Sequence, residues 1–351
     1  MRVVVTGATG NVGSALVQAL AGAERVDEIL GVARRRPDWP VAKTTWATAD
    51  VSRDDLTGLV QGADAVVHLA WLIQPSRDEA VTRATNVDGS RRVFEAALAA
   101  GVPSVIYASS VGAYAPGPKD RAVDESHPTT GIPTSFYARH KAEVERILDR
   151  LEREHPRTRF VRLRPGLTFQ REAGAEIRRL FAGPLLPGAL VRRGLIPVVP
   201  DTPRLRFQAV HALDVAEAYR RAILDDSARG AYNVAADPVL DGPELGRLLH
   251  ARPVPVPERA LRWAVALSWR ARLQPMPEGW VDMAFAVPVM DTSRVRRELG
   301  WSPRRSSGEA LLELLDGLRE SAGLPTPPLA PAAGGRLRLR EFLTGVGQTS
   351  R

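Results

Sequence analysis

Residues 2–13 of the 351-residue chain read Arg2-Val3-Val4-Val5-Thr6-Gly7-Ala8-Thr9-Gly10-Asn11-Val12-Gly13. A Val-rich run leads into three glycines spaced three apart, and helical apolar periodicity follows as far as Leu20. Glycine permits tight turns and close approach to a phosphate, and the N-terminus of a following helix offers free N–H groups. The stretch therefore predicts a dinucleotide-binding turn, with a plain structural turn as the alternative. The predicted cofactor contacts here are Gly7, Thr9, Gly10, Asn11, Val12 and Gly13.

Strands and helices continue to alternate after this first unit. Strand-like runs occupy residues 28–33, 44–47, 63–69, 105–108 and 160–163, with helical stretches between them. This alternation predicts an α/β fold with a doubly wound parallel sheet of the Rossmann type. Phe207–Val210 and Tyr232–Val234 also have the composition of strands, and we expect both to return to the main sheet.

Three regions are expected along the chain. Residues 1–165, with returning segments near 205–235, form the dinucleotide-binding domain, and residues 166–323 form a smaller, interleaved substrate-binding region. Residues 324–351 begin with a proline-rich run and are expected to be a linker and a mobile tail. The helical stretch Arg259–Leu273, with Trp263 and Trp269, either shapes an apolar lid over the substrate or packs into the core.

Composition narrows the class of protein. The chain has no cysteine and its six histidines are scattered, so neither a disulfide nor a metal site is expected. The net charge of +8 is spread along the chain without a recognisable nucleic-acid-binding element, so no nucleic-acid partner is expected. Because the chain shows no apolar run of membrane-spanning length and no signal-peptide core, we predict a cytoplasmic protein without membrane association.

A tyrosine and a lysine stand four residues apart in Tyr137-Ala138-Arg139-His140-Lys141, near the start of a predicted helix from about Thr134 to Glu154. Residues four apart lie on one face of a helix, so the ammonium lies near the phenol. A free phenol ionises near pH 10, and a neighbouring cation favours the phenolate needed for base catalysis near neutrality. With five tyrosines and three lysines, chance would give this spacing only about 0.04 times. An exposed Tyr/Lys pair on a helix face is the alternative.

Several further motifs resemble those of the extended short-chain dehydrogenases/reductases, the NAD-dependent epimerase/dehydratase family. The glycine spacing matches the family's TGxxGxxG pattern rather than the ordinary G-x-G-x-x-G. Similar landmarks along residues 1–320 are Asp50-Val51, His68-Leu69-Ala70-Trp71, Asn86-Val87-Asp88-Gly89, Ser109-Ser110, Arg164-Pro165-Gly166, Val210-His211-Ala212-Leu213-Asp214-Val215 and Glu298-Leu299-Gly300-Trp301. Trp71 stands where the family usually has a small residue.

The resemblance implies roles for some of these residues. Ser110 is the second serine of the family's SSxxxY segment and would hydrogen-bond the substrate oxygen beside Tyr137. Lys141 would also donate to the ribose hydroxyls of the cofactor. The remaining cofactor contacts implied are Asp50 and Val51 at the adenine, Ala70 after the fourth strand, Pro165 beside the nicotinamide, and Tyr137 itself.

The residues after the second predicted strand bear on the choice of nicotinamide cofactor. Arg34-Arg35-Arg36 follows Gly31-Val32-Ala33, at the strand end that meets the adenine ribose. An acidic residue there favours a free 2′-hydroxyl, whereas a guanidinium suits a 2′-phosphate. We therefore favour NADP(H) over NAD(H), with Arg34 as the contact; the alternative is the general abundance of arginine.

These predictions converge on an NAD(P)-dependent oxidoreductase that interconverts a hydroxyl and a carbonyl of a small molecule by hydride transfer, with Ser110, Tyr137 and Lys141 as catalytic residues. A nucleotide-sugar epimerase/dehydratase is the first alternative, disfavoured because Phe207 stands where epimerases commonly have arginine. A non-catalytic cofactor-binding sensor is the second. The substrate is defined further if four arginines bind an anionic group such as a pyrophosphate: Arg192, Arg193, Arg204 and Arg206. The alternative is that these arginines are solvated on the surface. The sequence does not decide the oligomeric state, and a homodimer is one option.

Overall fold

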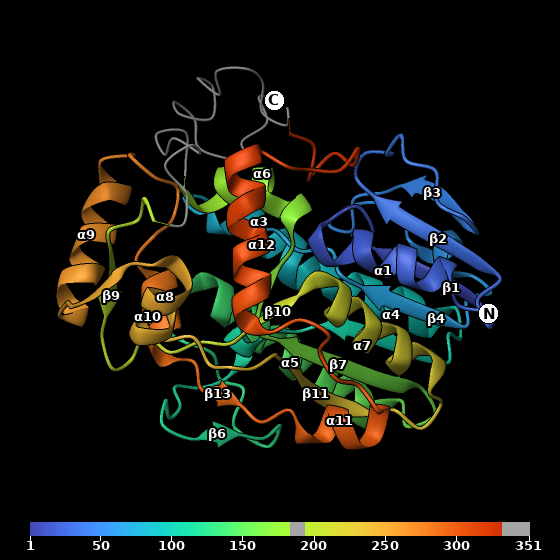
Figure 1. The fold of residues 1–351 in the computed structure, drawn as a ribbon. Coiled ribbons are helices and arrows are strands. Elements are labelled where there is room, and N and C mark those ends of the chain that lie inside the picture. The colour runs from blue at the N-terminus through green and yellow to red at the C-terminus, as the bar shows by residue number, and fades with distance from the viewer. Residues whose placement is uncertain (183–193, 332–351) are drawn as a thin grey trace.

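A computed structural model describes residues 1–182 and 194–331. A seven-stranded parallel sheet forms its centre (Figure 1). The strand order is β11 (Gly230–Val234), β7 (Arg159–Pro165), β5 (Ser104–Ala108), β4 (Ala65–His68), β1 (Arg2–Thr6), β2 (Glu28–Ala33) and β3 (Thr44–Thr48). The predicted doubly wound parallel sheet is confirmed.

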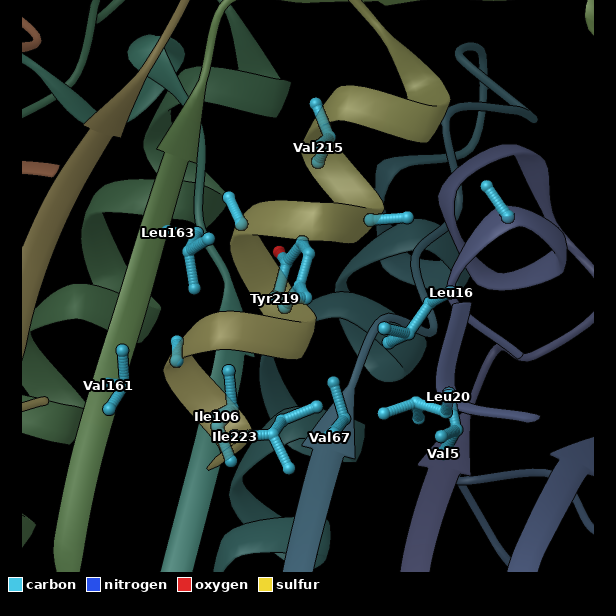
Figure 2. Close-up of a cluster of buried hydrophobic side chains, with 14 of the residues drawn as sticks. Val5, Leu16, Leu20, Val67, Ile106, Val161, Leu163, Val215, Tyr219 and Ile223 are labelled. Carbon is cyan, nitrogen blue, oxygen red and sulfur yellow. The ribbon is translucent and has the colours of Figure 1, made fainter. Parts of the chain in front are cut away.

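The two faces of the sheet are covered by different helices because side chains alternate along each strand. Val3 and Val5 face α1 (Asn11–Ala21) and α7 (Ala212–Leu224), whereas Val4 faces the opposite side. That second side is covered by α4 (Gly89–Ala99) and α5 (Phe136–Glu154), together with the short α2 (Thr57–Val60). Figure 2 shows the first layer, in which Leu16, Tyr219 and Ile223 pack over the strands.

In the part of the chain that the structure describes, three two-stranded sheets lie outside the main one. They pair β8 (Leu167–Phe169) with β10 (Ala209–His211), β9 (Val198–Asp201) with β12 (Arg252–Pro255), and β6 (Ala122–Val123) with β13 (Val289–Met290). The remaining α-helices of the described residues are α3 (Glu79–Arg83), α6 (Gly174–Ile177), α8 (Gly242–Leu249), α9 (Glu258–Arg270), α10 (Gly279–Ala286), α11 (Ser293–Leu299) and α12 (Ser307–Glu320). Short π-helical or 3-10 segments are η1 (Ala84–Asp88), η2 (Val111–Ala113), η3 (Arg171–Ala173) and η4 (Arg178–Ala182).

Of the two segments expected to return to the main sheet, one does so. Tyr232–Val234 belongs to β11, which pairs with β7. The prediction for Phe207–Val210 is wrong, because β10 pairs with β8 outside the main sheet. Gly166 explains the difference: the chain bends there after β7, and a Cβ at Gly166 would lie 2.6 Å from the carbonyl oxygen of Gln208. This close approach brings β8 beside β10 and away from the seven strands.

The proline-rich segment after α12 differs from the linker expected there. Thr326 and Leu329 are fully buried, and the Leu324 N–H donates to the Leu329 carbonyl at 3.3 Å. Proline-rich composition disfavours helix and strand, but it does not prevent packing. The expected mobile tail otherwise falls on residues 332–351, outside the described residues. Across residues 1–182 and 194–331, no helix combines the length and the apolar character required to cross a membrane.

Candidate active site at the carboxyl edge of the sheet

The predicted site residues gather where the strand connections diverge. From β1 the chain continues through α1 to β2 on one side, and from β4 it continues to β5 on the other. Parallel strands leave a crevice outside their carboxyl ends at such a point, and ligands bind there. The glycine turn follows β1, Ala70 follows β4, and Ser110 follows β5, so all three lie at this edge.

The glycine turn has the geometry expected of a phosphate cradle. Gly7 has φ of +73°, which disfavours any side chain, and a Cβ at Gly13 would lie 2.2 Å from the Gly7 carbonyl oxygen. At Gly10 a Cβ would meet only that oxygen, at 3.5 Å, so Gly10 faces open space. Gly10 precedes α1 without a side-chain cap, and the first turn of α1 has no acidic residue. The first N–H groups of α1 are thus available to an anion.

Asn11 connects this turn to the second half of the chain. Its Nδ2 donates to the Thr168 carbonyl at 3.0 Å, and Gln170 Nε2 donates to the Asn11 carbonyl at 3.0 Å. The Asn11 Oδ1 is buried without a partner in the described residues. Thr168 and Gln170 had no signal in the sequence, because they come from the irregular region after β7. Their contacts hold the start of α1 against β8.

The expected adenine side is built from the ends of β2 and β3. Arg34 follows β2 directly and is exposed. Asp50 follows β3, and its Oδ1 accepts hydrogen bonds from the Ser52 N–H at 3.0 Å and from the Ser52 hydroxyl at 2.7 Å. Burial acts to raise the pKa of Asp50, but these bonds and the charges of Arg34 and Arg53 lower it overall. The Asp50 carboxylate is therefore an ionised hydrogen-bond acceptor near Arg34. The adjacent Val51 is buried against Gly89.

Tyr137 and Lys141 lie together on α5, as their spacing predicts. Ser135 caps this helix by accepting a hydrogen bond from the Ala138 N–H at 3.4 Å. The Lys141 Nζ lies 5.8 Å from the centre of the Tyr137 ring. Burial raises the pKa of Tyr137, while hydrogen bonding with the Ser110 hydroxyl acts against this rise. Burial also lowers the pKa of Lys141 well below its usual value, against the opposing charge of Glu145.

The two adjacent serines have different surroundings. The Ser109 hydroxyl donates to Glu145 Oε1 at 2.5 Å, and this carboxylate also accepts from Arg164 Nε at 2.9 Å and pairs with Arg162 Nη1 at 3.2 Å. Ser110 Oγ accepts from the Gly112 N–H at 3.0 Å. Ser109 is therefore held in a buried ionic cluster, whereas the Ser110 hydroxyl interacts with Tyr137.

Aromatic residues around Tyr137 were not identified as site residues from the sequence. The Trp280 and Tyr137 ring centres are 5.0 Å apart, and Trp71 lies 5.8 Å from Tyr137 with its ring nearly perpendicular. Trp280 comes from α10, in the region without a regular pattern. The tryptophans that were considered for a lid are elsewhere: Trp263 is 59% exposed, and Trp269 lies under the Arg77 guanidinium, 4.3 Å from it.

A positive cluster lies near α10. Lys119 Nζ donates to the carbonyls of Arg206 and Ala284, each at 2.8 Å. Burial, followed by the charges of Arg204 and Arg206, lowers the pKa of Lys119 to about 7. Arg192 and Arg193, which we considered as partners of these arginines, lie outside the described residues. Within residues 1–182 and 194–331, no group of three or more acidic or histidine side chains could hold a metal ion.

Residues 3–235 match the family model described as the NAD dependent epimerase/dehydratase family. The chain belongs to this family. The match agrees with the resemblance in the glycine turn and the later motifs. The family's description names NAD as its cofactor.

Relatives and solved structures extend the comparison. The uncharacterized protein Rv2047c of Mycobacterium tuberculosis is 27% identical over 92% of this chain, which spans about a third of that relative (31%). An L-arabinose 1-dehydrogenase (NAD(P)(+)) of Haloferax volcanii is 37% identical over 31% of this chain and 41% of its own. The structure of UDP-glucose-4-epimerase from Stenotrophomonas maltophila with bound NAD and formylated UDP-arabinopyranose has a TM-score of 0.68 at 21% identity. The matched region covers 91% of this chain and 98% of the epimerase chain, so the two proteins share the same fold.

Proposed function

We propose that this protein is an NAD(P)-dependent oxidoreductase that interconverts a hydroxyl and a carbonyl on a small-molecule substrate. The observation that carries the proposal is the convergence of Ser110, Tyr137 and Lys141 with the open glycine turn at one sheet edge. A cofactor-binding sensor would need the turn alone, and it would have no use for a phenol beside a serine and an ammonium.

A nicotinamide dinucleotide, when bound, supplies the site that accepts or returns a hydride. The glycine turn would hold its pyrophosphate, because Gly10 leaves open space in front of the uncapped start of α1. Asp50, Val51, Ala70 and Pro165 are proposed to line the rest of that site. The protein itself handles the proton that accompanies the hydride.

In the oxidation direction, the Tyr137 oxygen takes the proton of the substrate hydroxyl. Ser110 orients that hydroxyl by hydrogen bonding, and the Lys141 ammonium stabilises the phenolate. In the reduction direction, the Tyr137 hydroxyl donates the proton to the carbonyl oxygen. Epimerisation would use both directions in succession at one carbon, without net redox change, so the same residues support either outcome.

The nucleotide-sugar epimerase remains a second candidate, and a specific observation favours it. Arg204 and Arg206 lie within charge range of Lys119, which contacts α10, the helix whose Trp280 packs against Tyr137, and guanidinium groups are typical phosphate ligands. The neighbouring structure with formylated UDP-arabinopyranose holds a ligand of this class.

Assays of the purified protein with NAD⁺ and NADP⁺ should distinguish these candidates. We expect reduction of the cofactor with at least one alcohol or sugar from a broad panel, measured by the absorbance of the reduced nicotinamide. Conversion of UDP-glucose to UDP-galactose without accumulation of reduced cofactor would favour the epimerase. If neither reaction occurs although both cofactors bind, the sensor interpretation replaces the proposal.

We also propose that Arg34 gives a preference for NADP(H), while NAD(H) is the cofactor that the family description names. Arg34 is exposed and, although its charge acts on the nearby Asp50, no salt bridge within 4 Å holds its guanidinium among the described residues, so it can reach a 2′-phosphate. Arg34→Asp should weaken NADPH binding by roughly 10- to 100-fold, as expected for charge-assisted hydrogen bonds. It should leave NADH binding equal or tighter, as measured by fluorescence titration.

Arg150→Asp, on the exposed surface of α5, makes the same charge change far from β2 and should alter neither affinity. If wild-type protein binds NADH and NADPH equally, or if Arg34→Asp leaves their ratio unchanged, Arg34 does not read the 2′-phosphate.

A further inference from the structure

Trp71 contacts both members of the Tyr137–Lys141 pair. The Lys141 Nζ lies over the Trp71 ring, 3.5 Å from its centre, and the Trp71 and Tyr137 ring centres are 5.8 Å apart at an interplanar angle of 73°. Trp71 follows β4, whereas Tyr137 and Lys141 are on α5. The indole therefore lies between the crevice edge at β4 and the helix that holds the phenol and the ammonium.

The hydrogen-bond partners of the Lys141 ammonium are neutral. Nζ donates to the Ala108 carbonyl at 2.6 Å and to the Tyr107 hydroxyl at 3.4 Å. Glu145 lies one helical turn away, but its carboxylate is occupied by Ser109, Arg162 and Arg164. Within the described residues, no ion pair joins Lys141 to a carboxylate. Lys141 is only 3% exposed, so little water replaces the missing counter-ion.

An aromatic face can supply part of the missing stabilisation. The face of an indole carries negative potential, and its attraction for an ammonium increases when both groups are removed from water. The 3.5 Å separation at Lys141 is well inside the range of this interaction. The Tyr107 ring is more distant from Nζ, at 5.0 Å, and the Tyr137 ring more distant still, at 5.8 Å. Trp71 is thus the dominant aromatic partner of the ammonium.

We propose that Trp71 is a positioning residue whose indole face holds the Lys141 ammonium, in its charged form, beside Tyr137. The functional meaning of this contact rests on the proposed function, in which Lys141 stabilises the Tyr137 phenolate. The contact itself belongs to the cofactor-free protein, so it can be tested without a substrate or a cofactor.

The small number of lysines makes a direct measurement practical. The chain has only Lys43, Lys119 and Lys141. Protein labelled with ¹³C-lysine should give three sets of ε-methylene signals in a proton–carbon correlation spectrum, and Lys43→Arg and Lys119→Arg assign the remaining set to Lys141. Lys43 and Lys119 both donate to backbone carbonyls and have no aromatic face among their described contacts. They serve as internal references.

In wild-type protein we expect the Lys141 ε-methylene protons to be shifted upfield of the other two sets by the ring current of Trp71. Trp71→Leu keeps an apolar side chain but removes the ring, so the upfield shift should be lost. Its Lys141 should also deprotonate at lower pH, with an acid dissociation constant about tenfold larger than in the wild type. Trp71→Phe restores an aromatic face and should recover part of both effects.

The proposal is overturned if Lys141 keeps its wild-type chemical shift and titration midpoint in Trp71→Leu. It is also overturned if wild-type Lys141 shows no upfield shift, a result that does not depend on whether Trp71→Leu folds. These spectra separate the inference from the proposed function. If the spectra confirm the contact but Tyr137→Phe is fully active, the proposed chemistry is rejected. If the spectra show no contact but Tyr137→Phe is inactive, only the role of Trp71 is rejected.

Discussion

Tyr137→Phe should bind the dinucleotide as wild-type protein does and lose about 10²- to 10⁴-fold in turnover, the usual contribution of a positioned general acid or base. The substitution removes only the oxygen that exchanges a proton with the substrate. The ring keeps its neighbours, since Trp280 packs against it with ring centres 5.0 Å apart. Cofactor affinity is measured by fluorescence titration, and turnover by the cofactor-coupled assay with the best substrate of the panel.

Tyr219→Phe provides the matched control. The Tyr219 hydroxyl is buried in the helix layer of α7 and has no hydrogen-bond partner among the described residues, so its removal should change neither binding nor turnover (Figure 2).

The pH profile of turnover gives a second criterion for the role of Tyr137. Because the base form of Tyr137 is the phenolate and burial raises the pKa of this group, alcohol oxidation by wild-type protein should increase with pH. Unchanged turnover in Tyr137→Phe would exclude the proposed proton route.

Local sequence patterns predicted the parts of this protein that depend on local physics. The glycine turn could be predicted because only glycine suits the φ of Gly7 and the contact between Gly13 and the Gly7 carbonyl oxygen. The pairing of Tyr137 and Lys141 could be predicted because helix geometry alone brings residues four apart together. In both cases, the relevant atoms are within a few residues of each other along the chain.

Non-local contacts could not be predicted in the same way. The composition of Phe207–Val210 indicated a strand, but the sheet that β10 joins depends on the bend at Gly166, some forty residues earlier. The sequence marked Trp71 only as an unusual residue, and nothing in it connected the indole to Lys141. Trp280 belongs to a region without strand or helix periodicity of its own on which to base a prediction, and its approach to Tyr137 depends on tertiary packing.

The buried Glu145 links the stability of the fold to the site. Its carboxylate accepts from Arg164 and Ser109 and pairs with Arg162, so it connects α5, strand β7 of the main sheet and the loop that carries Ser110. Burial alone would raise the pKa of Glu145, but the charges and hydrogen bonds of this cluster lower it to about 2. The carboxylate is therefore ionised at neutral pH and compensates two guanidinium groups that are almost completely buried.

Glu145→Gln should lower the free energy of unfolding by about 3–5 kcal/mol, since removal of one partner leaves buried charge uncompensated. The substitution keeps the shape of the side chain and removes only its charge. Urea denaturation at pH 7 measures the difference. A loss below about 1 kcal/mol would mean that water or other carboxylates, such as Asp149 and Glu152 around Arg162, already compensate the guanidinium groups.

Glu143→Gln is the matched control, because it makes the same substitution two residues earlier on α5. Glu143 pairs with Arg83 at 2.5 Å near the surface, where an ion pair contributes only about 0–1 kcal/mol.

The pH dependence of the unfolding free energy separates the two sites further. The folded-state pKa of Glu145 lies below its unfolded value, so its contribution is complete above the unfolded pKa and is lost as pH falls toward about 2. The unfolding free energies of Glu145→Gln and wild type should therefore differ most near neutrality, and the difference should shrink as pH falls through this acidic window. A difference that stays constant with pH would show that packing rather than charge is lost.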